Sequence, residues 1–324
     1  MELLEGGGEL LLACREEADG ICILRCVSSG GTVVLPEQIR GLPVTSLGPY
    51  ALSIREPRLE AVDIFWVRMT CGGPEPVHDA AAVSRAALPS TLRRLGDYAF
   101  YGCRGLRSLS LPDGTALGSE PFMNCSALDR LELTSRPGVR TSLRALLAEC
   151  TGDVEVALRL PGGEEARLFF PGYAESLELL AAPHIFQTRI QGGGYAFRQC
   201  FQDGALRFDQ YDVCLSRLLE AHDFSAACRV ALRRLRWPVS LSAPAEERYR
   251  QVLSLHGELA AGLLLEERDG EGLAFLLSLH ILSPAALTAA CDRARQLGDA
   301  GALAPLLEAQ RSTGGRGLDK SFDL

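Results

Sequence analysis

Residues 88–133 read LPSTLRRLGDYAFYGCRGLRSLSLPDGTALGSEPFMNCSALDRLEL, and this stretch decides the fold because it contains one unit written twice. Apolar and cysteine positions recur at an offset of 22 residues: Phe100 and Phe122, Cys103 and Cys125, Leu106 and Leu128, Leu109 and Leu131, Leu111 and Leu133. A period of roughly 20–29 residues indicates stacked structural repeats. One such unit cannot bury its apolar face alone, so neighbouring units must stack. Cys103 and Cys125 are then expected to lie one above the other in a buried row.

The repeat extends in both directions from this stretch. Upstream, from Val34, residues 50–52 match 98–100, and Leu59, Val62 and Ile64 match the leucines of the following unit. The register is lost at residues 65–87, where the turn-rich 71–76 predicts a loop insertion or a degenerate unit. Downstream, a degenerate repeat keeps the spacing of Phe100, Cys103, Leu109 and Leu111. Its residues are Leu147, Cys150, Val156 and Leu158. We therefore predict a repeat domain over residues 34–160.

Residues 1–33 predict an atypical first layer. Two apolar runs, 10–12 and 21–24, flank a turn signal at Asp19-Gly20, which favours a β-hairpin. The first repeat of a solenoid has no neighbour on one side, so a capping hairpin is expected there.

The full pattern, L-P-x-x-(V/L)-x-x-(L/I)-G-x-x-A-F-x-x-C-x-x-L-x-x-L-x-L-P, resembles the BspA-like leucine-rich repeat family over residues 20–135. The core GDYAFYGC at 96–103 and the opening GLPVTSLG at 41–48 carry this resemblance. The resemblance implies a stack of short strands that is common in bacteria, serves protein contact and lacks catalytic residues. Secreted members of the family adhere to host surfaces.

Beyond the repeats the pattern changes twice. Residues 161–206 form a junction, with a hairpin around 161–163, a short helix near 175–181 and an aromatic-rich run. Residues 207–311 have helical periods, with helix starts at Asp223, Ser242, Asp269, Ser283 and Asp299. Residues 269–310 resemble ankyrin-like helix pairs, and residues 312–324 predict a flexible tail. The predicted fold class is therefore α+β, a short leucine-rich repeat β-solenoid followed by an α-helical repeat domain.

Composition and charge narrow the function classes. The chain of 324 residues is 47% apolar and 23% charged, with a net charge of −8, which argues against nucleic acid and anionic lipid as partners. Its apolar runs fall short of the ~20 residues that span a membrane. The start is acidic, and Gly6–Gly8 interrupts any signal-like apolar core, so we predict a cytoplasmic protein. Eleven cysteines, an odd number, are interpreted as reduced, buried thiols.

The sequence contains no recognisable catalytic or metal-binding pattern. The cysteine and histidine spacings contain no C-x-x-C pair and no His-x3-His, so we predict neither metal nor cofactor. A glycine run at 192–194 lacks the lysine of a phosphate loop and predicts a turn. The basic cluster Arg229, Arg233, Arg234 and Arg236 predicts a solvated helix face.

The leading hypothesis is a non-catalytic protein–protein interaction or scaffold module of a bacterial cell, whose partner is an unknown protein. The predicted partner-binding positions are strand residues that point away from the core: Ala61, Asp63, Phe65, Ser108, Ser110, Arg130 and Glu132. One alternative is an exported adhesin anchored through Cys14. Another is an enzyme with a site in the aromatic junction, using Tyr173, His184 and Asp209.

Overall fold

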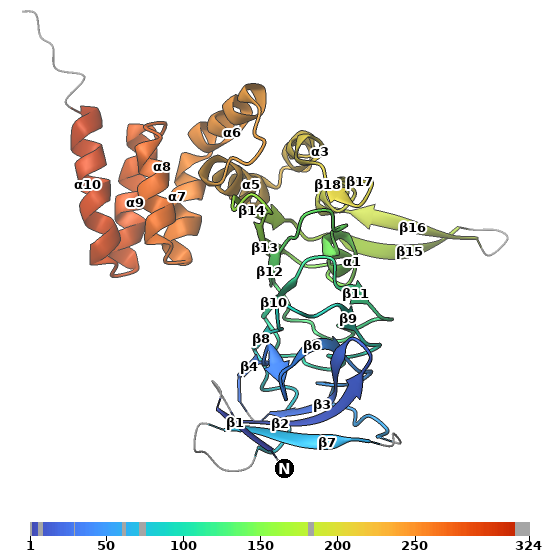
Figure 1. The fold of residues 1–324 in the computed structure, drawn as a ribbon. Helices are drawn as coiled ribbons and strands as arrows, with labels where there is room; N and C mark the ends of the chain where they lie inside the picture. Colours follow the sequence, from blue (N-terminus) through green and yellow to red (C-terminus); the bar gives the residue numbers. More distant parts are fainter. Residues whose placement is uncertain are drawn as a thin grey trace, which may run out of the picture. The chain divides into compact units, whose positions relative to one another are not determined.

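The chain divides into two compact units, Met1–Arg207 and Phe208–Leu324. The computed structural model, drawn in Figure 1, describes residues 2–5, 9–28, 30–59, 63–70, 76–180 and 185–314. The first unit carries the strands of a solenoid, and the second is helical. The predicted α+β class and the order of its parts are confirmed.

The first unit opens with an 8-stranded sheet that caps the solenoid. β2 (Leu10–Glu17) and β3 (Gly20–Ser28) form the antiparallel hairpin that the Asp19-Gly20 signal predicts. The sheet continues in parallel from β3 through β6 (Leu42–Leu47) and β9 (Arg94–Leu95) to β11 (Ala116–Leu117), and β5 (Gln38–Ile39) pairs with β6. The first layer is thus a hairpin that merges with the repeats.

The predicted insertion at 65–87 holds two strands of different sheets. β7 (Phe65–Thr70) lies between β1 (Glu2–Glu5) and β2 in the capping sheet, antiparallel to β2. β8 (Arg85–Ala87) is a regular repeat strand, because Val83, Ala86 and Leu88 are buried at the positions of Leu106, Leu109 and Leu111. The sequence pattern did not reveal this repeat, because Ala86 occupies a position where the following repeats have leucine.

The solenoid strands form a 6-stranded sheet in the order β14, β13, β12, β10, β8, β4. Its members are β4 (Thr32–Val34), β8, β10 (Ser108–Pro112), β12 (Arg130–Thr134), β13 (Val154–Arg159) and β14 (Glu165–Phe170). All neighbours pair in parallel except β13 and β14, which form the predicted hairpin. The parallel pairs stay in register, so equivalent residues of successive repeats stack.

The core repeats the same contacts from turn to turn. The rings of Phe100 and Phe122 stack with centroids 5.4 Å apart. The Cys103 thiol donates to the Leu52 carbonyl (3.4 Å), and the Cys125 thiol donates to the Phe100 carbonyl (3.1 Å). The predicted row of buried cysteines is therefore present, and its sulfur atoms bond to the backbone of the previous turn.

The last turn of the solenoid contains α1 (Leu143–Ala148), followed by β13. Leu147, Cys150, Val156 and Leu158, which carry the degenerate repeat of the sequence, are all buried. The predicted helix near 175–181 is wrong, because β15 (Ala174–Leu180) pairs antiparallel with β16 (Ile185–Gln191). The unit ends with α2 (Gly194–Phe197), β17 (Phe201–Gln202) and β18 (Ala205–Leu206).

The second unit consists of short helices joined by tight turns: α3 (Phe208–Val213), α4 (Leu215–Glu220), α5 (Phe224–Arg236), α6 (Ala243–Leu255), α7 (Gly257–Glu266), α8 (Gly270–Ser278), α9 (Pro284–Gln296) and α10 (Ala300–Gly314). Each predicted start is confirmed, because the side chains of Asp223, Ser242, Asp269, Ser283 and Asp299 accept the backbone N–H three residues later. Neighbouring helices pack in pairs, α5 on α6 and α9 on both α7 and α10 (Figure 1). Of the predicted tail from 312, residues up to 314 belong to α10, and 315–324 lie outside the described residues.

Candidate functional site

The outward face of the 6-stranded sheet presents side chains in rows that cross the strands. Alternation places Val33, Ala86, Leu109, Leu131 and Val156 inward, where each is at most 1% exposed. The residues on either side of them point outward and pair in register: Thr32, Arg85, Ser108, Arg130 and Glu155 in one row, and Val34, Ala87, Ser110, Glu132 and Ala157 in the next. We call these ten residues the sheet face.

Four of the predicted site residues belong to the sheet face. Arg130 and Glu132 are exposed, Ser110 is half-buried and Ser108 is only 7% exposed. Within the described residues, Arg85, Arg130 and Glu132 form no ion pair. The face therefore offers unpaired charges of both signs around a floor of small side chains.

Of the other three predicted residues, the two that the structure describes do not lie on the sheet face. Phe65 begins β7 and pairs with Cys14 in the capping sheet. Asp63 precedes that strand in a left-handed turn with φ of 71°. Ala61 lies outside the described residues. The positions of the face that sequence reasoning missed, such as Glu155 and Ala157, could have been found from their inward neighbours Val156 and Leu158.

A groove lies on the opposite side of the first repeats, where the chain leaves β6. Its volume is about 430 Å³, and its lining residues are Arg15, Leu24, Pro49, Tyr50, Arg55, Glu56, Pro57, Arg58 and Leu59. We call it the 50–59 groove. A second hollow of about 370 Å³ shares Arg15, Leu24 and Pro49 with it. No local sequence pattern marks this groove. Tyr50 aligns with Tyr98 in the repeat, and their rings stack with centroids 5.3 Å apart.

A buried arginine holds the loop that forms this groove. Arg25 is 5% exposed, and its guanidinium donates to the carbonyls of Tyr50 (3.3 Å), Ser53 (2.9 Å) and Arg55 (3.4 Å). Burial lowers the pKa of Arg25. Ring nitrogen Nε2 of His78 lies 2.9 Å from the same Ser53 carbonyl, and burial lowers the pKa of His78. These contacts give His78 a structural role.

The cysteines do not gather into a metal site within the described residues, which hold no group of three or more potential ligands. Burial raises the pKa of Cys26 and Cys103 to about 12 and that of Cys150 to about 11. Such thiols stay protonated and unreactive near neutral pH. Cys14, the anchor of the adhesin alternative, is 0% exposed within β2, and cleavage before it would remove Leu10–Ala13 from the hairpin.

The three residues of the enzyme alternative fall in different parts of the chain. Tyr173 lies in the first unit, where its ring packs against Tyr195 (5.4 Å) and lies under the Arg198 guanidinium (5.0 Å). Burial raises the pKa of Tyr173. Asp209 belongs to α3 of the second unit, and His184 lies outside the described residues. Arg198 itself is 4% exposed and donates to the carbonyls of Gly152 (2.7 Å) and Pro171, so it holds the end of the solenoid.

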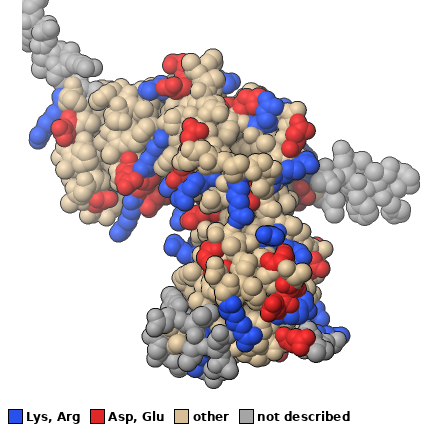
Figure 2. Space-filling model, in the orientation of Figure 1, with Lys and Arg blue, Asp and Glu red and all other residues tan. Residues whose placement is uncertain are grey.

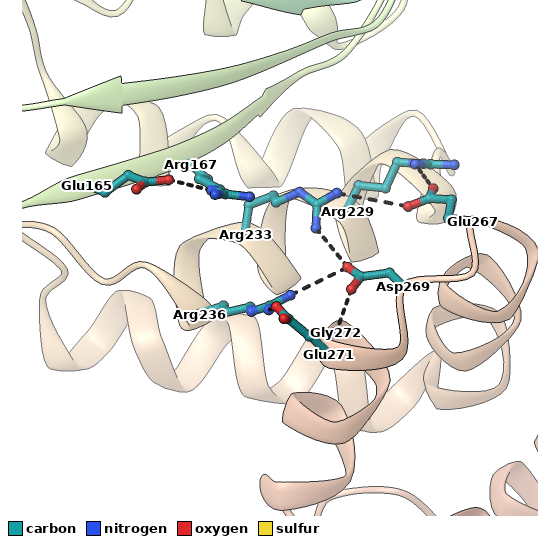
Figure 3. A network of polar contacts seen from close by, with 9 residues as sticks. All are labelled: Glu165, Arg167, Arg229, Arg233, Arg236, Glu267, Asp269, Glu271 and Gly272. Atoms are coloured by element: carbon teal, nitrogen blue, oxygen red, sulfur yellow. Dashed lines mark hydrogen bonds and ion pairs between the residues drawn. The ribbon is translucent and has the colours of Figure 1, made fainter. Parts of the chain in front are cut away.

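The basic cluster of α5 is bonded within the helical unit, which corrects its prediction as a solvated face. Figure 3 shows Arg229 and Arg233 reaching Glu267, and Arg233 and Arg236 reaching Asp269. Arg234 is 0% exposed and forms a two-bond pair with Asp212 at 2.7 and 3.0 Å. These arginines connect helices, and they leave no basic strip for a phosphate backbone.

On the face shown in Figure 2, acidic and basic side chains are interspersed. Among the described residues, none of the helices is both long and apolar enough to cross a membrane.

Comparison with known proteins supports the repeat assignment. Residues 78–152 match the family model described as BspA type Leucine rich repeat region (6 copies). The crystal structure of a T. pallidum leucine-rich repeat protein is similar at 22% identity and a TM-score of 0.26, over 39% of this chain and 52% of that one. The match thus spans about half the length of that protein. No curated protein matches the chain. Repeats of this kind are typical of protein-interaction modules.

Proposed function

We propose that the protein is a non-catalytic protein-interaction module of a bacterial cell, and that the sheet face binds its partner in the cytoplasm. The observation that supports this most is the set of unpaired charges of Arg85, Arg130 and Glu132 on strands held in register. A face built on paired strands loses little conformational entropy on binding, so such charges confer specificity at low cost. The matched repeats at 78–152 include all three residues.

The cytoplasmic part of the proposal has its own support. The ten cysteines of the described residues carry reduced thiols, and all but Cys214 are buried. Reduced thiols stacked in a core suit a reducing compartment. Cell fractionation and intact-mass measurement test this, since we expect a chain in the cytosol that retains its N-terminal sequence. A lipid-modified chain that begins at Cys14 would contradict it.

Quantitative affinity purification tests the face. We expect the Arg130→Ala/Glu132→Ala variant to recover at least about fivefold less of the main partner than wild type. This corresponds to the loss of one or two polar contacts. Arg217→Ala/Glu220→Ala on α4 is the matched control, because it removes an exposed pair of the same residue types. Equal recovery of the same partner by both variants would refute the sheet face as the binding surface.

A further inference from the structure

The 50–59 groove has an apolar floor that is open to solvent. Leu24 and Tyr50 are half-buried, and Leu59 is 37% exposed. With Pro49 and Pro57 these side chains surround a hollow of about 430 Å³, enough for one or two apolar side chains of a ligand. Rigid rings and prolines bind an extended chain with little loss of conformational freedom.

The rim of the groove is positive in a chain whose net charge is −8. Arg15, Arg55 and Arg58 line it against the single acid Glu56. Arg15 is already bound to Glu17 at 2.6 Å. Arg55 and Arg58 form no ion pair within the described residues, and the Arg55 guanidinium lies 5.2 Å from the centre of the Tyr50 ring. Two unpaired guanidinium groups beside an apolar floor are suited to carboxylates that flank an apolar side chain.

The groove is held before any ligand binds. Arg25 fixes the carbonyls of Tyr50, Ser53 and Arg55 from below. The backbone N–H groups of Leu52 and Ile54 donate to the carbonyls of Ala99 (2.7 Å) and Tyr101 (2.9 Å) in the next repeat. These hydrogen bonds to Arg25 and to the next repeat fix the backbone that carries Arg55, so the loop is ordered before a ligand binds.

We propose that the 50–59 groove binds a short acidic segment of a protein partner, with an apolar side chain on the floor and carboxylates on Arg55 and Arg58. This inference rests on the proposed function and adds a second face with a defined ligand chemistry. Two arginines are too few to hold a phosphate backbone against the acidic total, since nucleic-acid affinity depends on many such contacts. Carboxylates of a peptide need only these two.

The test uses the full chain and a phage-displayed library of random linear peptides. We expect enriched peptides to carry Asp or Glu beside Leu or an aromatic residue. Measured by fluorescence anisotropy on synthetic copies, the Kd should rise at least about tenfold in Arg55→Glu/Arg58→Glu, as two lost charged contacts imply. It should rise less in Arg55→Gln/Arg58→Gln, and all affinities should weaken as salt increases.

Arg136→Glu/Arg144→Glu is the matched control, because it reverses two exposed arginines that belong neither to the groove nor to the sheet face. Its Kd for the enriched peptides should stay within about twofold of wild type. Enriched peptides without acidic residues, no enrichment, or equal binding by the groove variants would each overturn this inference. Peptides that lose affinity for an Arg85→Glu/Arg130→Glu variant of the sheet face, and not for the groove variants, would overturn it while leaving the proposed function intact.

Discussion

At the scale of single residues, the second unit depends on one buried charge. Arg234 would be costly to bury alone, and Asp212 neutralises it through two hydrogen bonds. The Tyr249 hydroxyl donates to Asp212 at 2.8 Å, and the Arg234 guanidinium also donates to the Val239 carbonyl at 3.0 Å. Burial, followed by the charge of Asp212, raises the pKa of Tyr249 far above its ordinary value, so the hydroxyl remains a donor.

Removing Asp212 should therefore destabilise the helices strongly. We expect Asp212→Ala to lower the free energy of unfolding by about 3–5 kcal/mol, because a buried guanidinium is left unpaired. Tyr249→Phe should cost about 1–2 kcal/mol, since the Arg234 pair survives. Urea denaturation followed by circular dichroism measures both, with Arg217→Ala as the exposed control near zero. A small effect of Asp212→Ala would show that the pair contributes little.

The glycines on the other side of the solenoid permit close contact between turns. A Cβ added to Gly96 would lie 2.5 Å from the Gly48 carbonyl carbon, and one on Gly118 would lie 2.8 Å from the Gly96 carbonyl carbon. Both clashes are with backbone, which has no room to move without separating the repeats.

Gly96→Ala should accordingly destabilise the chain by about 1–3 kcal/mol. Gly162→Ala is the matched control, because a Cβ there meets no atom within 4 Å and should change stability by less than about 0.5 kcal/mol. Thermal unfolding of both variants beside wild type makes the comparison. Equal melting temperatures would contradict the close packing of the turns.

At the scale of elements, Asp269 combines two roles. Its side chain accepts the Gly272 N–H at 2.8 Å as the N-cap of α8, and it also pairs with Arg233 and Arg236 of α5 (Figure 3). Asp299 caps α10 by accepting the Ala302 N–H at 2.9 Å. The comparison of the two separates capping from pairing between helices.

We expect Asp299→Ala to cost about 1 kcal/mol, the usual loss of an N-cap. Asp269→Ala should cost about 1 kcal/mol more, because two half-exposed guanidinium groups lose a partner. The excess should shrink in high salt, where ion pairs are screened, while the capping loss should not. Chemical denaturation at two salt concentrations checks this, and a salt-independent difference would contradict it.

The cysteine row makes the solenoid sensitive to alkali. The pKa of Cys103 is raised from 9.0 to about 12 by burial, so its neutral thiol is favoured in the folded chain. Ionisation of Cys103 therefore leaves the free energy of unfolding unchanged below pH 9, where the unfolded thiol is still protonated. Between pH 9 and pH 12 the thiol ionises in the unfolded chain only, and stability falls.

At pH 10 each such thiol should lower the free energy of unfolding by about 1.4 kcal/mol compared with neutral pH. The difference in unfolding free energy between pH 8 and pH 10 should be smaller in Cys103→Ala than in wild type by that amount. Urea titrations at the two pH values measure the difference directly, whatever the absolute cost of the cavity. Identical pH dependence of the two proteins would mean that Cys103 ionises normally in the folded chain.

The sequence predicted the elements best where local spacing decides structure. The recurring leucines at 106, 109 and 111 define both strand and register, and the Asp and Ser caps define the helix starts. Long-range pairing could not be read. Residues 65–70 pair with β2, which lies far away in the sequence, and the loss of the repeat register at 65–87 did not indicate this pairing. Residues 174–180 have a helix-favouring composition, and pairing with 185–191 overrides it.

The candidate site shows the same division. Arg130 and Glu132 were placed correctly because they alternate with Leu131 and Leu133, which are buried. Asp63 and Phe65 were misplaced, because Asp63 lies in a turn and Phe65 begins β7 of the capping sheet. The 50–59 groove depends on Arg25 and on hydrogen bonds to the next repeat, which no local pattern reveals. The local sequence does not distinguish Arg234 from Arg233 and Arg236, since its partner Asp212 is 22 residues away.

At the scale of the whole molecule, the chain joins a solenoid unit to a helical unit, each with its own core. Buried cysteines, arginines and histidine are all used to hold these cores in the described residues. The sheet face, with Arg85, Arg130 and Glu132, and the 50–59 groove, with Arg55 and Arg58, lie in the solenoid unit and carry exposed charges that form no ion pair within the described residues. We therefore expect the protein partner to bind the solenoid unit.

Hydrogen–deuterium exchange of the full chain, with and without its purified partner, shows which unit binds. We expect binding to slow exchange in peptides that cover 85–87, 108–112 and 130–134, with further protection at 50–59 if an acidic segment of the partner occupies the groove. Protection confined to 208–314, with exchange in the solenoid unit unchanged, would show that the helical unit binds the partner instead.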